Sequence, residues 1–518
     1  MTLETLDDDE HAHHGTHDVL HEVMDMTSSA MEALSRSALV GDADGTVKRR
    51  GTVVGSTATL ANCAIGAGVL AIPFAIRELG YALGGIVVLV AAMLVAYTLL
   101  VLVRAGSAFG STSYQGLVKD AFGLNVSRAV SVVLIVYLFG SCVAYLIIIG
   151  DSYTKVVSAF AGDAASAWWA NRRFAIAIIG AFVVTPLSLL REMSRLALAS
   201  AMAVMALGYT ATVIMCKGLT PPADSTALAT AFKLDIGSIS AVPIVVFAFQ
   251  CHIQVLAIFS ELGSSETAQS GEIIELHDSS ASERRRMKRM RVVIALAVGV
   301  CFVGYISVGE FAYISHPDVT SNVLDSYDKN DKAMLLATIL MGCSAVSSFP
   351  VNHHAARAAL DDLLASAFGW EECAPGQAPA TRHVSQTLGF VLIAAVVSFA
   401  VTDLGKVFEL VGATCGSLVM FVIPALLLVH PKMREENRDT LDPLEDLAGL
   451  DDVTRELLSS ARDLLERDFG EDAGDIEEDV VGIPRLNSPG VGATVTATTL
   501  CLIALFVATS NVYVIFFR

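Results

Sequence analysis

Long apolar stretches, separated by polar segments, run through most of the chain from about residue 53 onward. Each stretch holds about 18 to 25 predominantly apolar residues, the length that an α-helix needs to cross a bilayer. The pattern predicts an all-α polytopic membrane protein with about 11 transmembrane helices. We expect these helices at residues 53–78, 83–104, 128–150, 173–190, 194–217, 238–260, 291–315, 333–356, 385–402, 406–430 and 491–516.

Composition agrees with this pattern, because 54% of the residues are hydrophobic, 17% are charged and the mean hydropathy is +0.59. Such values lie far from those of soluble globular proteins. The formal net charge of −19 belongs mainly to two segments. Residues 1–50 carry eleven acidic and four basic residues (−7), and residues 431–490 carry eighteen acidic and seven basic residues (−11). The membrane core is therefore close to neutral, and the acidity does not predict a cationic substrate.

These composition shifts divide the chain into four parts. Residues 1–50 are charged and poor in aromatic residues, as is typical of a disordered acidic cytosolic tail. Residues 51–430 contain the first ten expected helices, and residues 491–518 contain the eleventh. Between them, residues 431–490 form an acidic cytosolic loop, in which the apolar stripe of residues 451–468 predicts one amphipathic helix.

Lys and Arg residues predict the orientation, because cytosolic loops carry an excess of them. With the amino terminus in the cytosol, the inner segments hold 24 of the 34 basic residues, including the run ERRRMKRMR at 283–291. An odd number of helices then places the carboxyl terminus outside the cell or in a lumen.

The first expected helix contains a cluster of residues that interrupt helices. Asn62, Gly66, Gly68 and Pro73 fall within twelve residues of the stretch TLANCAIGAGVLAIPFAIRELGY (59–81). Gly lowers the cost of leaving helical geometry, and Pro removes a backbone donor. A helix broken here exposes free amide N–H groups that suit a carboxylate. The alternative, a Gly-Ala-Gly face for tight helix packing, stays open from these residues alone.

The sixth expected helix is interrupted as well. Pro243, Gln250, His252 and Gln254 lie within the apolar stretch SAVPIVVFAFQCHIQVLAIFSEL (240–262). Polar residues at this depth are costly and usually face a cavity or a partner. The first and sixth helices occupy matching positions in two halves of five helices. Paired interruptions of this kind indicate an inverted-repeat transporter with a site near the middle of the membrane.

Four motifs resemble signatures of the amino acid/auxin permease family, which includes sodium-coupled neutral amino acid transporters and vacuolar amino acid transporters. NCAIGAGVLAIPFAIRELGY (62–81) is similar to the first-helix signature, and PIVVFAFQCHIQVLAIFSEL (243–262) to the sixth-helix signature. SSFPVNHHAARAAL (347–360) resembles the eighth helix, and VTDLGKVFELVGATCGSLVMFVIPALLLV (401–429) the ninth-to-tenth segment. The resemblance implies a five-plus-five inverted repeat of the LeuT class with one additional helix.

The resemblance also implies where an amino acid would bind, between the first, third, sixth and eighth helices. Its ammonium would meet carbonyl groups of the broken helices. Phe247, Phe249 and Gln250 are candidates to shape the side-chain pocket, although core packing is an equal alternative for either Phe. The carboxylate would meet the backbone amides of Ile65, Gly66, Ala67, Gly68 and Val69.

Coupling to an ion is expected, and both H⁺ and Na⁺ stay open. In sodium-dependent relatives, the Asn of the first helix and a hydroxyl residue of the eighth are implied to line the ion site. Asn62 matches, but the aligned position is Cys343, with Ser344 next to it. Sulfur is a poor ligand for a hard cation, which favours proton coupling. His252 is the candidate proton carrier, and a neutral His bonded within the helix bundle is the alternative.

A cytosolic gate is a further hypothesis. Arg191 and Arg195 flank the start of the fifth expected helix, and Glu261 ends the sixth on the same side. An ion pair between them would close the inner side of the site. Anchoring of these side chains at the membrane interface is the alternative.

The sequence therefore predicts a secondary active transporter for small neutral L-amino acids, acting as a monomer in the plasma membrane, a vacuole or a lysosome. A transporter-like receptor that signals through its cytosolic tail and loop is the alternative. We expect no enzymatic activity, because no nucleophile–base pair, metal-ligand spacing or phosphate-binding loop stands out. No cofactor, resident metal or nucleic-acid partner is expected.

Overall fold

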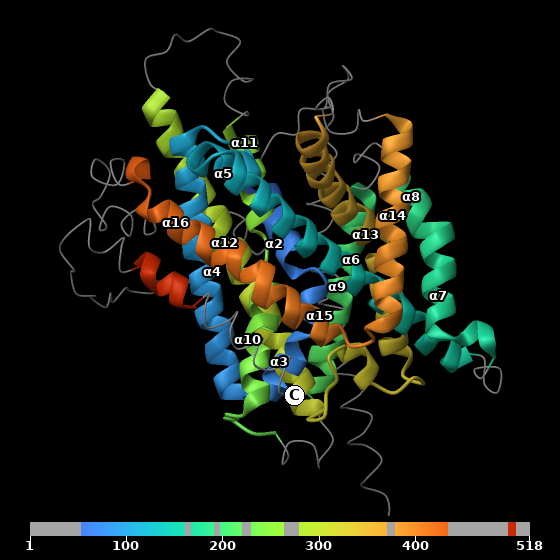
Figure 1. The fold of residues 1–518 in the computed structure, drawn as a ribbon. Coiled ribbons are helices and arrows are strands. Elements are labelled where there is room, and N and C mark those ends of the chain that lie inside the picture. Colours follow the sequence, from blue (N-terminus) through green and yellow to red (C-terminus); the bar gives the residue numbers. More distant parts are fainter. Residues whose placement is uncertain are drawn as a thin grey trace, which may run out of the picture.

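The structure is a computed structural model that describes residues 53–160, 167–190, 197–219, 229–263, 279–369, 379–433 and 496–503. Every regular element within these ranges is helical, and none of them contains a strand (Figure 1). The acidic tail 1–50, the amphipathic segment 451–468, Arg191 and Arg195 lie outside the described residues. Predictions about them stay predictions.

The first five expected spans all have helical counterparts. The first is divided into three pieces, and the fourth contains a π-helical turn. A short helix, α5, connects the second and third spans. In chain order the elements are α2 (Val53–Ile65), η1 (Ala67–Leu70), α3 (Ile72–Leu79), α4 (Tyr81–Phe109), α5 (Tyr114–Phe122), α6 (Leu124–Phe160), η3 (Trp168–Ala170), α7 (Arg172–Ile179), η4 (Gly180–Val184), α8 (Thr185–Leu189) and α9 (Ala197–Gly218).

The next five spans repeat this organisation, beginning with a second divided helix. These elements are α10 (Ile236–Ala248), α11 (His252–Gly263), α12 (Ser279–Ser315), η6 (Val323–Ser326), α13 (Lys332–Phe368), α14 (Ala380–Ala400), α15 (Leu404–Val411), η7 (Gly412–Gly416), η8 (Leu418–Val422) and α16 (Ile423–Val429). Within the described ranges, 8 helical segments are long and apolar enough to cross a membrane. Of the eleventh span only a helical stretch at 496–503 is described, so the count of 11 is not confirmed.

The two divided helices lie at the centre of the bundle (Figure 1). α3 packs against α10, and α12 packs against both α2 and α3. On the other side, α6 and α13 pack along each other and face the divided helices. This arrangement surrounds the two interruptions with protein rather than lipid, the condition under which non-helical backbone is tolerated at this depth.

The end of α3 and the start of α10 are joined by hydrogen bonds. Ser238 Oγ donates to the carbonyl oxygen of Glu78 at 2.8 Å, and the N–H of Lys233 donates to that of Leu79 at 2.8 Å. Asp235 completes a capping box at the start of α10 with Ser238. The second half of the first helix and the first half of the sixth are thereby tied together.

Candidate functional site

Both predicted helix interruptions are confirmed. α2 ends at Ile65, and Gly66 has a non-helical backbone (φ 14°, ψ −146°) before η1 begins. The sixth span leaves helical geometry between Ala248, the last residue of α10, and His252, the first of α11. The first N–H groups of a new helical segment have no acceptor within it, so each interruption supplies free backbone donors.

Gly66 and Gly68 have different surroundings. A Cβ atom added to Gly68 would lie 2.7 Å from Cα and 2.9 Å from Cβ of Ala248, closer than packed atoms approach. A Cβ added to Gly66 would meet only Tyr145 Oη, at 3.7 Å. Gly68 therefore serves close packing between the two interrupted helices, whereas Gly66 borders an open space.

Tyr305 of α12 joins the two interruptions from the packed side. Its hydroxyl lies 2.9 Å from the carbonyl oxygen of Ala64 and 2.6 Å from that of Ala248. The side chain is fully buried. Because these carbonyls stand at the ends of α2 and α10, one hydroxyl satisfies acceptors that the interruptions expose. No sequence signal predicted this role, because one Tyr in an apolar helix does not stand out in composition.

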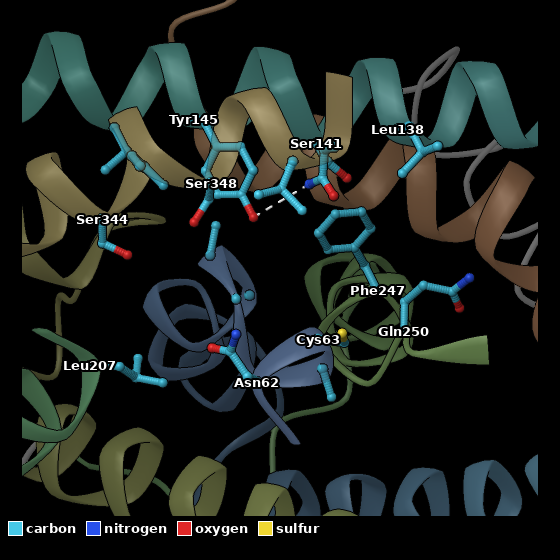
Figure 2. Close-up of a pocket in the computed structure, with 18 of the residues that line it drawn as sticks. Asn62, Cys63, Leu138, Ser141, Tyr145, Leu207, Phe247, Gln250, Ser344 and Ser348 are labelled. Carbon is cyan, nitrogen blue, oxygen red and sulfur yellow. Dashed lines mark hydrogen bonds between the residues drawn. The ribbon is translucent and has the colours of Figure 1, made fainter. Parts of the chain in front are cut away.

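A cavity of about 130 Å³ opens on the other side of the interruptions (Figure 2). This volume suits a small organic molecule rather than one or two waters. None of the described residues that line the cavity is charged. They come from the two interrupted helices, α6, α9, α13 and α15: Asn62, Cys63, Ala64, Gly66, Ala67, Gly68, Tyr137, Leu138, Ser141, Tyr145, Ile148, Leu207, Phe247, Gln250, Gln254, Met341, Ser344, Ala345, Ser347, Ser348, Val351, Asn352 and Phe408.

Gln250 lines the cavity, and its buried side-chain amide is left without hydrogen-bond partners. It is 4% exposed, and neither its amide nitrogen nor its amide oxygen has a hydrogen-bond partner in the structure. An unsatisfied buried amide costs about 1–3 kcal/mol. A bound molecule that hydrogen-bonds to Gln250 would recover part of this free energy.

The two predicted pocket aromatics have different roles. Phe247 lines the cavity, stacks on Phe408 at 4.5 Å between ring centroids and contacts Tyr137 at 5.4 Å. Phe249 does not line the cavity. Its ring packs edge-on against Tyr305 at 4.9 Å, and it is 1% exposed. The geometry of Phe249 thus matches the core-packing alternative.

Two of the four residues predicted for ion coupling line the cavity, and the other two do not. Asn62 of α2 and Ser344 of α13 line the same cavity, and both are labelled in Figure 2. Cys343 is exposed and does not line it. His252 is fully buried, and its Nε2 lies 2.9 Å from Oγ1 of Thr98 on α4, away from the cavity lining. This is the bonded position that the sequence left as the alternative.

Three other predicted residues lie outside the cavity lining. Ile65 is half-buried at the end of α2, and Val69 is buried in η1. Glu261 is exposed near the end of α11. Since Arg191 and Arg195 are not described, the proposed gate between them and Glu261 is not tested.

The cavity also contains polar residues that the sequence did not single out. Ser348 and Asn352 of α13 follow the predicted Ser344 at intervals of four residues, so the three side chains share one helix face. Asn352 Nδ2 lies 3.5 Å from Tyr145 Oη, the dashed line in Figure 2. The four-residue spacing was the available signal, because a polar stripe on a membrane helix indicates a face turned away from lipid.

The family and the relatives that this chain matches are amino acid transporters. The family described as transmembrane amino acid transporter protein matches residues 49–439. Sodium-coupled neutral amino acid transporter 7 of Xenopus laevis is 27% identical over 390 residues, covering 74% of this chain and 81% of the relative. Its Homo sapiens counterpart is 27% identical over 398 residues, with coverages of 74% and 81%.

A solved structure shows the fold. Mhp1, a nucleobase-cation-symport-1 family transporter in a closed conformation with bromovinylhydantoin bound, superposes with a TM-score of 0.50 at 12% identity. The match covers 88% of this chain and 92% of Mhp1. The LeuT-like transporter fold that the resemblance implied is therefore confirmed. With a family match over most of its length, the chain belongs to the transmembrane amino acid transporter family.

Proposed function

We propose that this protein is a secondary active transporter that carries a small neutral L-amino acid across a membrane, coupled to an ion gradient. The single observation that supports this most strongly is the uncharged cavity at the two adjacent helix interruptions. The relatives that the chain matches are named as transporters of neutral amino acids.

A zwitterion suits this cavity because its charges can be met by backbone dipoles. The carboxylate would accept hydrogen bonds from the free N–H groups at the start of η1, next to Gly66. The ammonium would meet backbone carbonyls near the ends of α2 and α10. A substrate with a charged side chain would lack a counter-ion, since the described lining has none, and burying an unpaired charge is costly.

The side chain of the substrate would lie between Phe247 and Gln250. Phe247, held by its stack on Phe408, offers an apolar wall. Gln250 offers a donor and an acceptor that have no partner in the protein. This pair favours neutral side chains and leaves room for one hydrogen bond.

For the coupling ion we propose Na⁺. Asn62 and Ser344 bring a side-chain amide oxygen and a hydroxyl oxygen to one cavity, and oxygen is the ligand that hard cations prefer. His252, the candidate for proton coupling, is bonded to Thr98 instead. The relatives named above are called sodium-coupled, which agrees with this choice.

Alternating access would follow from the divided helices. α3 and α10 are tied together at the ends that we assign to the outer side, while α2 and α11 are separate segments joined to them through non-helical backbone. We infer that the inner segments swing relative to the outer pair. Arg77 of α3 also donates to the carbonyl oxygen of Val319 at 2.8 Å, so opening to the outer side requires this bond to break.

The test is uptake of labelled amino acids into proteoliposomes that contain the purified full-length protein. We expect uptake of neutral amino acids driven by an inward Na⁺ gradient, with loss of uptake when choline replaces Na⁺. Accumulation that follows a pH gradient in Na⁺-free buffer would instead assign coupling to H⁺. Substrate binding without any flux would contradict transport and support a receptor.

A further inference from the structure

The first three turns of α12 expose four basic residues, Arg284, Arg285, Lys288 and Arg289, and the first three of these are considered together. Arg284, Arg285 and Lys288 are exposed, and none of them forms an ion pair with a described acidic residue. Arg284 and Lys288 are four residues apart and therefore adjacent on the helix surface. Like charges at this spacing repel each other, so an anionic partner would stabilise this surface. We refer to these three residues as the basic stripe.

The basic stripe continues the face of α12 that is turned away from the protein. Further along the helix, the exposed residues are Ala295, Gly299, Val300 and Val303. From Arg285 to Val303 is eighteen residues, or five full turns at 3.6 residues per turn, so both project in the same direction. Val300 and Val303 are 54% and 61% exposed in a membrane-spanning segment, which makes this the lipid-facing side.

The depth of the basic stripe follows from the charges along α12. Residues 292–309 contain no charged side chain. These eighteen residues span about 27 Å at 1.5 Å per residue, close to the thickness of the hydrocarbon core. Lys288 then lies about 6 Å beyond that core, in the headgroup layer. Arg284 lies about 12 Å beyond the core, at the outer boundary of the headgroups, which its long side chain can reach.

The opposite side of the same turns is fixed to the protein. Arg286 lies over the ring of Phe259 at 3.8 Å, and its Nε donates to the carbonyl oxygen of Phe259 at 2.9 Å. Ser107 of α4 donates a hydrogen bond to Glu283. The start of α12 is therefore held against α4 and α11, while the basic stripe faces outward at a fixed height. In Figure 1, α12 begins at the same end of the bundle as α5 and α11.

We propose that the basic stripe is a binding site for the headgroups of anionic phospholipids, in the leaflet where α12 begins. A lipid is the partner that fits, because the stripe lies on the lipid-facing side of the helix and at headgroup depth. Anionic headgroups attract each nearby Lys or Arg by about 1 kcal/mol. The site is separate from the cavity, so it stands whether or not the proposed transport activity is correct.

The experiment measures enrichment of fluorescent phosphatidylserine around the labelled full-length protein, by energy transfer, in phosphatidylcholine vesicles with about one fifth phosphatidylserine. We expect R284Q/R285Q/K288Q to lower the association constant of phosphatidylserine relative to phosphatidylcholine by about fivefold for each charge removed, and high salt to lower it in the wild type. R284K/R285K keeps the charges and should keep the enrichment.

The matched control removes three exposed lysines at the other end of the bundle, as K329Q/K332Q/K406Q. This control should leave the enrichment of phosphatidylserine around the start of α12 unchanged. Equal enrichment in the wild type and R284Q/R285Q/K288Q, both with unchanged melting temperatures, would overturn the proposal. So would a wild type that does not distinguish phosphatidylserine from phosphatidylcholine, which would leave the acidic segment 431–490 as the occupant.

Discussion

The two sides of the interrupted helices differ in how closely they are packed and in whether their polar groups have hydrogen-bond partners. On the side of α12, Gly68 fits closely against Ala248, and the hydroxyl of Tyr305 bonds to carbonyls of both helices. On the side of α6 and α13, Gly66 borders an open cavity and Gln250 has no partner for its amide. A folding requirement explains the first side only. The second side is left unsatisfied where a bound molecule would satisfy it, which distinguishes a binding site from a packing defect.

The largest effect is expected on the packed side, at Gly68. Gly68→Val should prevent correct folding and abolish uptake, because even its Cβ would lie 2.7 Å from the backbone of Ala248. The measurement is the yield of monodisperse protein together with uptake. Gly299→Val is the control, since a Cβ at that exposed position of α12 meets nothing within 4 Å. Normal yield and uptake for Gly68→Val would mean that the two helices are not in contact as described.

On the cavity side, Gln250→Leu should separate binding from folding. The substitution removes an unsatisfied amide and keeps a similar shape, so the melting temperature should be unchanged or higher. Uptake at low substrate concentration should fall by tenfold or more, because the bound molecule loses a hydrogen bond worth about 1.5 kcal/mol. A lower melting temperature with normal uptake would place Gln250 among the packing residues instead.

Tyr305→Phe tests the link between the two interruptions. The ring remains, but two buried carbonyls lose their shared donor, and the free energy of unfolding should fall by about 1–3 kcal/mol. Tyr313→Phe on the same helix is the matched control, since that hydroxyl bonds only near Thr230, outside the interrupted region. If the two variants melt at the same temperature, Tyr305 does not hold the helices together.

The smallest effect on transport is expected at His252. His252→Gln removes the bond to Thr98 on the packed side, at a cost of about 1 kcal/mol in stability. Uptake by this variant should depend on pH and on Na⁺ in the same way as uptake by the wild type. A variant that loses pH dependence while keeping its fold would return His252 to the role of a proton carrier.

The sequence predicted the helical elements well, because hydropathy reports directly on contact with lipid. It underestimated the length of α6, which was expected at 128–150 and extends over Leu124–Phe160. The polar end of α6 continues as helix because Lys155 donates to the carbonyl oxygen of Tyr327 at 2.9 Å. A contact between residues so far apart in the chain leaves no periodic signal, so hydropathy could not extend the helix.

The candidate site was predictable in position but not in detail. Gly and Pro in the first helix, and polar residues in the sixth, indicated both interruptions. Which side of a helix faces the cavity depends on packing, so Phe247 and Phe249 could not be told apart. For the same reason, Ser344 could not be separated from Cys343, or His252 recognised as bonded to Thr98.

The most direct test of the central claim is a structure of the protein with a transported amino acid bound in the presence of Na⁺. We predict that its carboxylate lies within hydrogen-bond distance of the backbone N–H groups of Ala67 and Gly68, and that its side chain contacts Phe247 or Gln250. A substrate bound elsewhere, with Gln250 still unpartnered and the cavity beside Gly66 holding only water, would contradict the account.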